Sequence, residues 1–149
     1  MNLAVELAVS VVLLVLVTVI HGTGISTMDR WLRTSDRDFG ASRLVQREVA
    51  VMIPMALFLL ALHILEIFVF AVFYLATGDA KDMHEALYHS GLAYTTMGVM
   101  EGGITKWMIV SVFEGLSGFL MIGWSSAVFV TDMDRLLRHR GITPPPPKS

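Results

Sequence analysis

The stretch ALYHSGLAYTTMGVMEGG, residues 86–103, lies between two long apolar runs and decides how the whole chain folds. Its first half has the residues of a helix, whereas its second half consists mainly of threonines, glycines and methionines. The helical half is about a dozen residues long, which is too short to cross a bilayer. The sequence therefore predicts a short helix and a polar loop inserted between two membrane-spanning helices.

The composition is that of an integral membrane protein. Of the 149 residues, 54% are hydrophobic and 16% are charged, and the mean hydropathy is +0.65. Soluble domains carry about 25% charged residues, so this chain has too few for an ordinary soluble surface. The arginines are scattered singly, which argues against a nucleic-acid partner, and the lack of cysteine excludes disulfides and thiolate metal sites.

Three apolar runs predict an all-α integral membrane fold with three transmembrane helices. The first run lies in an N-terminal segment, residues 1–24, in which HGTG (21–24) is expected to end the helix. No Lys or Arg precedes this run, so we interpret it as a retained helix and not as a signal peptide. The second helix is expected over 49–77, with Pro54 as a candidate kink, and the third over 107–131.

The charges between the runs set an orientation. Residues 25–48 hold five arginines among apolar side chains, and the tail, residues 132–149, holds three arginines and a lysine. The segment 78–106 holds two lysines against four acidic residues. The positive-inside rule therefore places the linker and the tail in the cytoplasm and the N-terminus outside, in a multi-pass protein of the cell (inner) membrane. The linker is either an interfacial, partly helical amphipathic segment with Trp and Arg at the lipid headgroups or a solvated connecting loop.

The segment 82–101 combines a helix start with a loop of oxygen ligands. Asp82 and Glu85 form the pattern of a capping box, which predicts a helix from about Met83 to Tyr94. A polar helix at membrane depth must be buried in protein or line a water-filled cavity, so we expect it to be re-entrant. Its C-terminal carbonyls would favour a cation, and the Thr-Thr-x-Gly that follows offers hydroxyl and carbonyl oxygens as ligands.

Three blocks of the sequence, HILEIFVFAVFYLATG (63–78), ALYHSGLAYTTMG (86–98) and FEGLSGFLMIGWSSAVF (113–129), resemble a small bacterial group of the two-helix potassium-channel pore family. The resemblance covers residues 49–131, the expected pore domain. Members of this group have an extra leading helix and typically the filter Thr-Thr-x-Gly-Tyr-Gly-Asp. The resemblance implies a homotetramer in which four copies of a pore helix and filter loop surround one axis and conduct cations passively.

The resemblance also implies which residues bind the ion. It assigns the ion-binding filter to five consecutive residues: Thr95, Thr96, Met97, Gly98 and Val99. Within it, Thr95, Thr96 and Gly98 would coordinate a monovalent cation, K⁺ or Na⁺, and no organic cofactor is implied.

The outer end of the filter departs from the family pattern. Val99 stands where the family has tyrosine, Met100 where it has its second glycine, and Glu101 where it has aspartate. Methionine disfavours the backbone conformation of that glycine, so we expect the outer filter to be wider, relaxed or occluded and potassium selectivity to be reduced or altered. Met100 and Glu101 form the expected pore mouth, where four Glu101 carboxylates would maintain a preference for cations.

Four ionisable residues fall within the apolar runs. His63 and Glu66 are three residues apart on one helical face, and we interpret them as a structural pair that ties helices together, with a functional role as the alternative. Glu114 is expected either to bond to the short helix behind the filter or to pair with His63. Glu6 lies near the outer boundary of the first run, where it could reach the interface.

Glycines punctuate the third run at Gly115, Gly118 and Gly123. Small residues let helices pack closely, and close packing is our main interpretation of these three positions. A gating hinge at Gly118 or Gly123 is the alternative, because the inner helix of a channel must bend or splay to open.

Two other functions fit parts of the sequence. A non-conducting scaffold or regulatory membrane protein of the pore family would account for the altered filter. A haem-binding membrane subunit would use His63 and His89, but it needs two histidines at matching depth on facing helices. An enzyme is not expected, because no nucleophile with a base, no paired metal ligands and no phosphate loop can be recognised.

Overall fold

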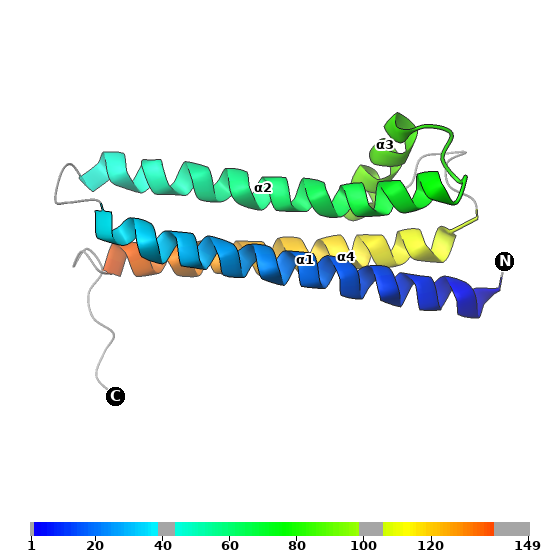
Figure 1. The fold of residues 1–149 in the computed structure, drawn as a ribbon, viewed down its shortest axis with the longest axis horizontal. Coiled ribbons are helices and arrows are strands. Elements are labelled where there is room, and N and C mark those ends of the chain that lie inside the picture. Colours follow the sequence, from blue (N-terminus) through cyan, green and yellow to red (C-terminus); the bar gives the residue numbers. More distant parts are fainter. Residues whose placement is uncertain (1, 39–43, 99–105, 139–149) are drawn as a thin grey trace.

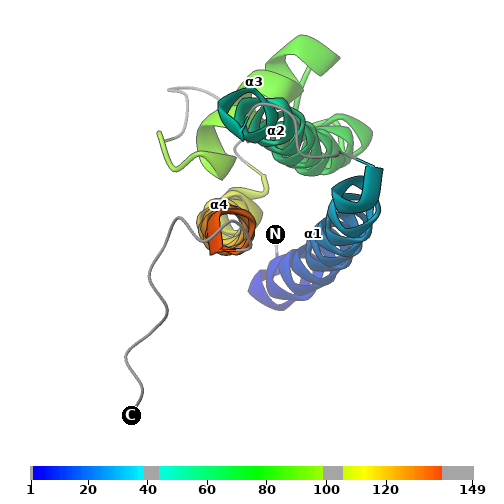
Figure 2. The ribbon, with the colours of Figure 1, turned by 90° about the vertical axis from the view of Figure 1, so that its left-hand side faces the viewer.

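A computed structural model describes residues 2–38, 44–98 and 106–138 of the chain. Over these residues the fold is all-helical, with four helices: α1 (Leu3–Asp38), α2 (Leu44–Ala76), α3 (Met83–Tyr94) and α4 (Met108–Arg138). Helices α1, α2 and α4 run side by side along the longest axis, and α3 lies against α2 at the end of the molecule that carries the N-terminus (Figure 1). Seen end on, the three long helices form a triangle, and α3 crosses α2 towards α4 (Figure 2).

Each of the three long helices is long and apolar enough to cross a membrane. The candidate spans are Leu3–Leu32, Ala50–Ala76 and Met108–Arg135. Their outward faces carry large apolar side chains that the chain leaves exposed, such as Val12 (66% exposed) and Phe119 (69%). A surface of this kind is covered by lipid or by a partner, so the prediction of three membrane-spanning helices is confirmed as far as length, apolarity and fold class.

The first helix does not end at HGTG. Helix α1 continues through residues 21–24 to Asp38, so most of the predicted linker is helical and not a loop. Gly24 serves packing here, because a Cβ at this position would lie 2.7 Å from both terminal methyl groups of Leu62 on α2. The hydroxyl of Thr23 donates to the carbonyl of Val19 in the preceding turn, which satisfies this polar group within the helix. The prediction that the helix ends at residues 21–24 was wrong, because glycine and threonine also suit close contacts between helices at membrane depth.

Helix α3 starts where the sequence predicted. Asp82 is its N-cap, and the carboxylate accepts a hydrogen bond of 2.8 Å from the backbone N–H of Glu85. The Glu85 carboxylate in turn accepts from the backbone N–H of Lys81 at 2.9 Å. Asp79 lies shortly before α3 in the chain. Its carboxylate accepts hydrogen bonds of 3.2 Å from the backbone N–H groups of Lys106 and Trp107, which fixes the start of α3 next to the start of α4.

The main hydrophobic core lies at the α3 end of the bundle. It joins all four helices through Leu13, Val17, Phe70, Ala71, Tyr74, Ala80, Ala86 and Val110. A smaller cluster of Met28, Met55 and Leu59 packs α1 against α2 at the other end. The short helix is therefore held against the long ones by a continuous apolar contact, and this contact positions the residues that follow it.

Candidate functional site

The C-terminal end of α3 rests on two glycines of α4. A Cβ built on Gly118 would lie 1.9 Å from the carbonyl oxygen of Tyr94, and a Cβ on Gly115 would lie 3.1 Å from that of Ala93. Real side chains cannot approach a backbone atom as closely as 1.9 Å, so Gly118 is required for the helix contact. A Cβ built on Gly123 would have no neighbouring atom within 4 Å among the described residues. The geometry favours the packing interpretation for Gly118 and gives no packing role to Gly123.

Tyr94, the last residue of α3, anchors the helix end through its phenol. The side chain is buried, and its hydroxyl donates a hydrogen bond to Oε2 of Glu66 on α2. Nδ1 of His63 lies 2.9 Å from the same phenol oxygen. Burial raises the pKa of the Tyr94 phenol well above its ordinary value, and the bond to Glu66 raises it further. The phenol therefore keeps its proton and acts as a donor.

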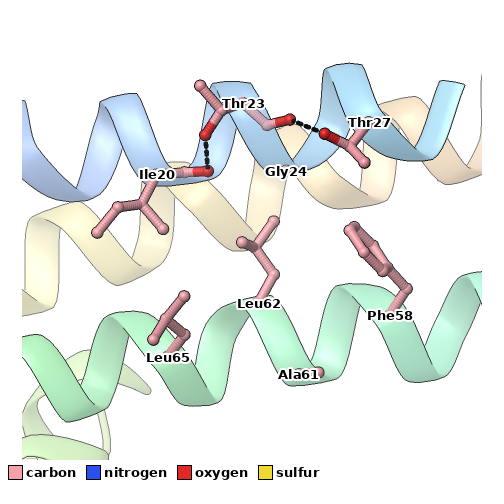
Figure 3. Close-up of a pocket in the computed structure, with 8 residues that line it drawn as sticks. All are labelled: Ile20, Thr23, Gly24, Thr27, Phe58, Ala61, Leu62 and Leu65. Atoms are coloured by element: carbon pink, nitrogen blue, oxygen red, sulfur yellow. Dashed lines mark hydrogen bonds between the residues drawn. The ribbon is translucent and has the colours of Figure 1, made fainter. Parts of the chain in front are cut away.

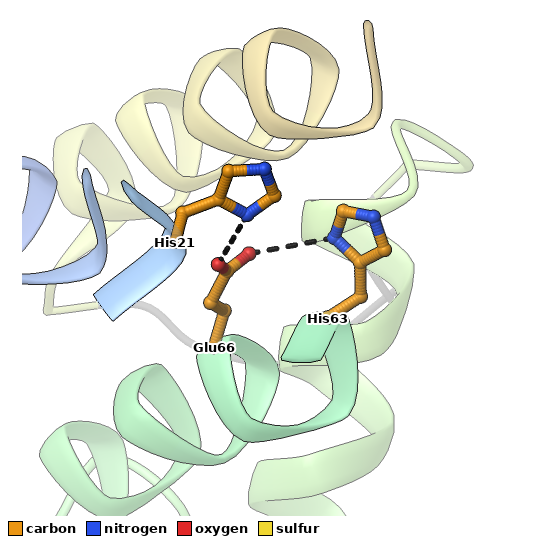
Figure 4. A group of neighbouring side chains, drawn as sticks. All are labelled: His21, His63 and Glu66. Atoms are coloured by element: carbon orange, nitrogen blue, oxygen red, sulfur yellow. Dashed lines mark hydrogen bonds and ion pairs between the residues drawn. The ribbon is translucent and has the colours of Figure 1, made fainter. Parts of the chain in front are cut away.

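Glu66 connects this anchor to α1. Its second oxygen, Oε1, lies 2.7 Å from Nδ1 of His21, and both side chains are fully buried (Figure 4). Nε2 of His21 lies 3.3 Å from the hydroxyl of Ser125 on α4. His21, His63, Glu66 and Tyr94 form one group, which we call the histidine–glutamate cluster. It links all four helices when Ser125 is included.

A second buried group lies around Glu114. The Tyr74 hydroxyl donates to Oε2 of Glu114 at 2.8 Å, and the Ser90 hydroxyl is hydrogen-bonded to Oε1. Ser90 Oγ is also 2.8 Å from the carbonyl oxygen of Ile67. Of the two contacts expected from the sequence for Glu114, it makes the one to the short helix. The group joins α2, α3 and α4 in the interior, where an unpaired carboxylate would be costly.

His89 is buried beside the Glu114 group. Its Nε2 lies 3.3 Å from the hydroxyl of Ser111, and its ring packs edge-on against Tyr74 with centroids 5.3 Å apart. Nδ1 of His89 has no hydrogen-bond partner among the described residues. Burial lowers the pKa of His89, and the negative charges of Asp79 and Glu85 oppose this in part. His89 and His63 thus belong to two separate hydrogen-bond networks, which does not favour the haem interpretation.

The residues that follow Tyr94 form an exposed helix cap. The backbone N–H groups of Thr96 and Met97 donate to the carbonyls of Ala93 and Leu92, at 3.0 and 2.9 Å, as in a Schellman motif. The Thr95 hydroxyl donates back to the carbonyl of Gly91 at 2.6 Å.

This cap places the four residues that the sequence predicts to form the inner filter on the outside of a single chain. Thr96 has a φ of 58° and Gly98 one of 112°, so a β-branched residue occupies a left-handed position that normally favours glycine. Thr95, Thr96, Met97 and Gly98 are all exposed, Met97 to 78%. The other residues predicted for the filter and the pore mouth, Val99, Met100 and Glu101, lie outside the described part of the chain.

Glu6 has a different place from the one expected. It is buried, and its Oε2 accepts a hydrogen bond of 3.2 Å from the backbone N–H of Ile109 in the first turn of α4. A carboxylate suits a helix N-terminus, where N–H groups lack partners within the helix. Glu6 therefore fastens the start of α1 to the start of α4 instead of reaching outward.

A cavity of about 480 Å³ lies between α1 and α2. It is lined by Ile20, Thr23, Gly24, Thr27, Phe58, Ala61, Leu62 and Leu65 (Figure 3). The hydroxyls of Thr23 and Thr27 both donate to carbonyls of their own helix. The cavity therefore offers an apolar surface and no free hydroxyl donor for a polar substrate.

Sequence reasoning missed the contacts of His21 with Glu66 and Ser125. His21 was expected at the end of a helix, whereas it lies inside α1, with its ring centroid 5.4 Å from that of His63. The signal was available, because an ionisable residue inside an apolar helix usually faces a partner in the protein interior.

Comparisons of the chain with models of protein families, with curated proteins and with solved structures find no match in any of the three.

Proposed function

We propose that the chain is one subunit of a homotetrameric cation channel of the potassium-channel superfamily. In this proposal α3 is a re-entrant pore helix and residues 95–99 are the filter loop. The observation that carries it is the contrast at the end of α3. Tyr94 is buried and bonded to Glu66, whereas the next four residues, Thr95 to Gly98, are exposed, and three of them are threonine or glycine.

The contrast supports a pore because a loop inserted between two membrane-spanning helices must be kept away from lipid. Irregular backbone is not tolerated against lipid, so a loop of this kind must face water or protein at membrane depth. Four chains around one axis would bring four copies of this loop together and enclose a polar path. The rigid contact of Tyr94 with Gly118 would hold each loop at a fixed radius.

The chemistry of the loop favours cations over anions. The segment from Thr95 to Gly98 offers hydroxyl and carbonyl oxygens and contains no basic side chain. It follows the C-terminal end of a 12-residue helix, which carries the negative end of the helix dipole. Val99 and Met100 lack the aromatic hydroxyl and the glycine of the family filter, so the proposal is a channel with reduced or altered potassium selectivity.

Ion flux into liposomes that contain the purified chain tests the proposal. With potassium and sodium gradients applied separately, we expect flux of both ions, and cross-linking in the same liposomes should give a tetramer. The double variant Val99→Tyr with Met100→Gly should shift the flux towards potassium, because it restores the Gly-Tyr-Gly part of the family filter. A tetramer without flux in both proteins would overturn the channel and leave a scaffold of the pore family. A monomer without flux would overturn both.

A further inference from the structure

Three potential metal ligands converge in the bundle interior. His21, His63 and Glu66 each place one ligand atom within 4.8 Å of the others, and they come from α1 and α2 (Figure 4). His21 and Glu66 are fully buried, and the His63 side chain is 16% exposed. Among the described residues, this is the one group of three or more histidines and carboxylates with such a spacing.

We propose that His21, His63 and Glu66 bind one divalent transition-metal ion of the zinc class. Zinc takes imidazole nitrogen and carboxylate oxygen at about 2.0–2.2 Å, so tetrahedral ligand atoms lie roughly 3.4 Å apart. His63 Nδ1 and Glu66 Oε2 are already 3.4 Å apart. His21 Nδ1 lies 2.7 Å from the other carboxylate oxygen, Oε1, so the Glu66 carboxylate would have to turn and offer a single oxygen to the ion that both rings bind.

The surroundings of His21 resemble those of a metal-bound histidine. Ligand histidines usually bond through their second ring nitrogen to a neighbouring group, which fixes the ring and its tautomer. Here Nε2 of His21 is 3.3 Å from the Ser125 hydroxyl, and the Trp124 ring packs against the imidazole with centroids 5.3 Å apart. Both contacts orient Nδ1 towards Glu66, so Ser125 is a positioning residue for the site.

The net charge of the three ligands also suits a divalent ion. Two neutral imidazoles and one carboxylate leave the bound site with a single positive charge, and three protein ligands leave a fourth position open. The Tyr94 phenol contacts both His63 and Glu66. A metal ion would compete with Tyr94 for these two side chains. Binding would thus change the anchor of the residue that directly precedes the exposed loop.

Metal binding to the purified chain tests this site directly, independently of ion flux. We would titrate the protein in detergent with Zn²⁺ by equilibrium dialysis, and with Co²⁺ as a spectroscopic substitute. We expect one ion per chain and the visible absorption bands of four-coordinate Co²⁺. Loss of a ligand in His21→Ala or His63→Ala should weaken binding by more than roughly 100-fold, beyond the effect typical of a supporting residue. His84→Ala, at an exposed histidine of α3, should bind like the parent protein.

A serine pair separates a metal site from general damage to the bundle. Ser125→Ala should weaken zinc binding by roughly 10- to 100-fold, the range for loss of a supporting hydrogen bond. Ser126→Ala should not change it, because the Ser126 side chain is exposed and its hydroxyl donates to the carbonyl of Ile122 in its own helix. No zinc binding by the parent protein, or equal binding by the parent, His21→Ala and His63→Ala proteins, would overturn the proposal. The group would then be a set of hydrogen bonds only. If His21→Ala does not fold, His63→Ala and Ser125→Ala decide the outcome.

Discussion

Gly118 of α4 lies directly against the backbone carbonyl of Tyr94, so closely that a Cβ on Gly118 would be 1.9 Å from the carbonyl oxygen. The contact joins one helix backbone to another without side chains between them. Because Tyr94 is also the residue that bonds to Glu66, this one position of α3 is held from both sides.

This contact predicts that Gly118→Ala destabilises the chain. The added methyl group must push α3 away from α4, and overpacking of this kind costs about 1–3 kcal/mol. Thermal unfolding in detergent, followed by circular dichroism, measures the effect. Gly123→Ala is the matched control, because no atom lies within 4 Å of its Cβ and alanine favours a helix by about 1 kcal/mol. Equal destabilisation by both variants would contradict the packing role of Gly118.

The hydrogen bonds around Glu114 predict that Ser90→Ala lowers the stability of the fold. Removing this hydroxyl leaves Oε1 of Glu114 without its partner in the interior, and such a loss costs about 1–3 kcal/mol. The variant Ser126→Ala again serves as the control, since its hydroxyl bonds only within its own helix turn. The same unfolding experiment compares the two. An unchanged melting temperature for Ser90→Ala would mean that Glu114 is satisfied in another way.

Much of the fold could be predicted because the relevant signals are local. The apolar runs predict helices over 49–77 and 107–131, and the structure has α2 over Leu44–Ala76 and α4 over Met108–Arg138. The capping pattern predicts α3 from about Met83 to Tyr94, and these are its bounds. Length and periodic apolarity decide such elements without any knowledge of their neighbours.

The candidate sites could be predicted only in part, because they depend on how the helices are rotated against one another. The sequence pairs His63 with Glu66 by spacing, but only packing brings His21 to the same carboxylate. The glycines at 22 and 24 suggested a break, although a lipid-covered helix tolerates glycine where another helix comes close. The outer filter, Val99 to Glu101, lies outside the described residues, so the expectations for selectivity and the pore mouth stay predictions.

His89 predicts a loss of stability in acid. Burial lowers its pKa in the folded chain below the ordinary value of 6.5, so the unfolded chain binds the proton more tightly. The stability from neutral His89 is complete above about pH 6.5 and is lost as the pH falls below that value. The groups around the imidazole are Ser111 and Tyr74, with Asp79 and Glu85 as the opposing charges.

Unfolding measured across this pH range, in the parent and in His89→Gln, isolates the effect of that one imidazole. The variant stays neutral at all pH values, so its stability should fall less steeply towards acid than that of the parent. His84→Gln, at an exposed histidine, should keep the parent's slope. If the His89→Gln and parent curves run parallel, His89 does not titrate differently in the folded chain.

Thr96 predicts a conflict between stability and function. Its φ of 58° is unfavourable for a β-branched residue, so Thr96→Gly should stabilise the single chain by about 1 kcal/mol. In the proposed channel the same change removes four hydroxyls and stiffness from the ion path, so cation flux should fall. Met97→Ala is the control for the melting temperature alone, since that side chain is 78% exposed and its residue has no positive φ. Melting temperature and liposome flux, measured on the same preparations, should move in opposite directions for Thr96→Gly. A rise in both would mean that the threonine hydroxyl takes no part in conduction.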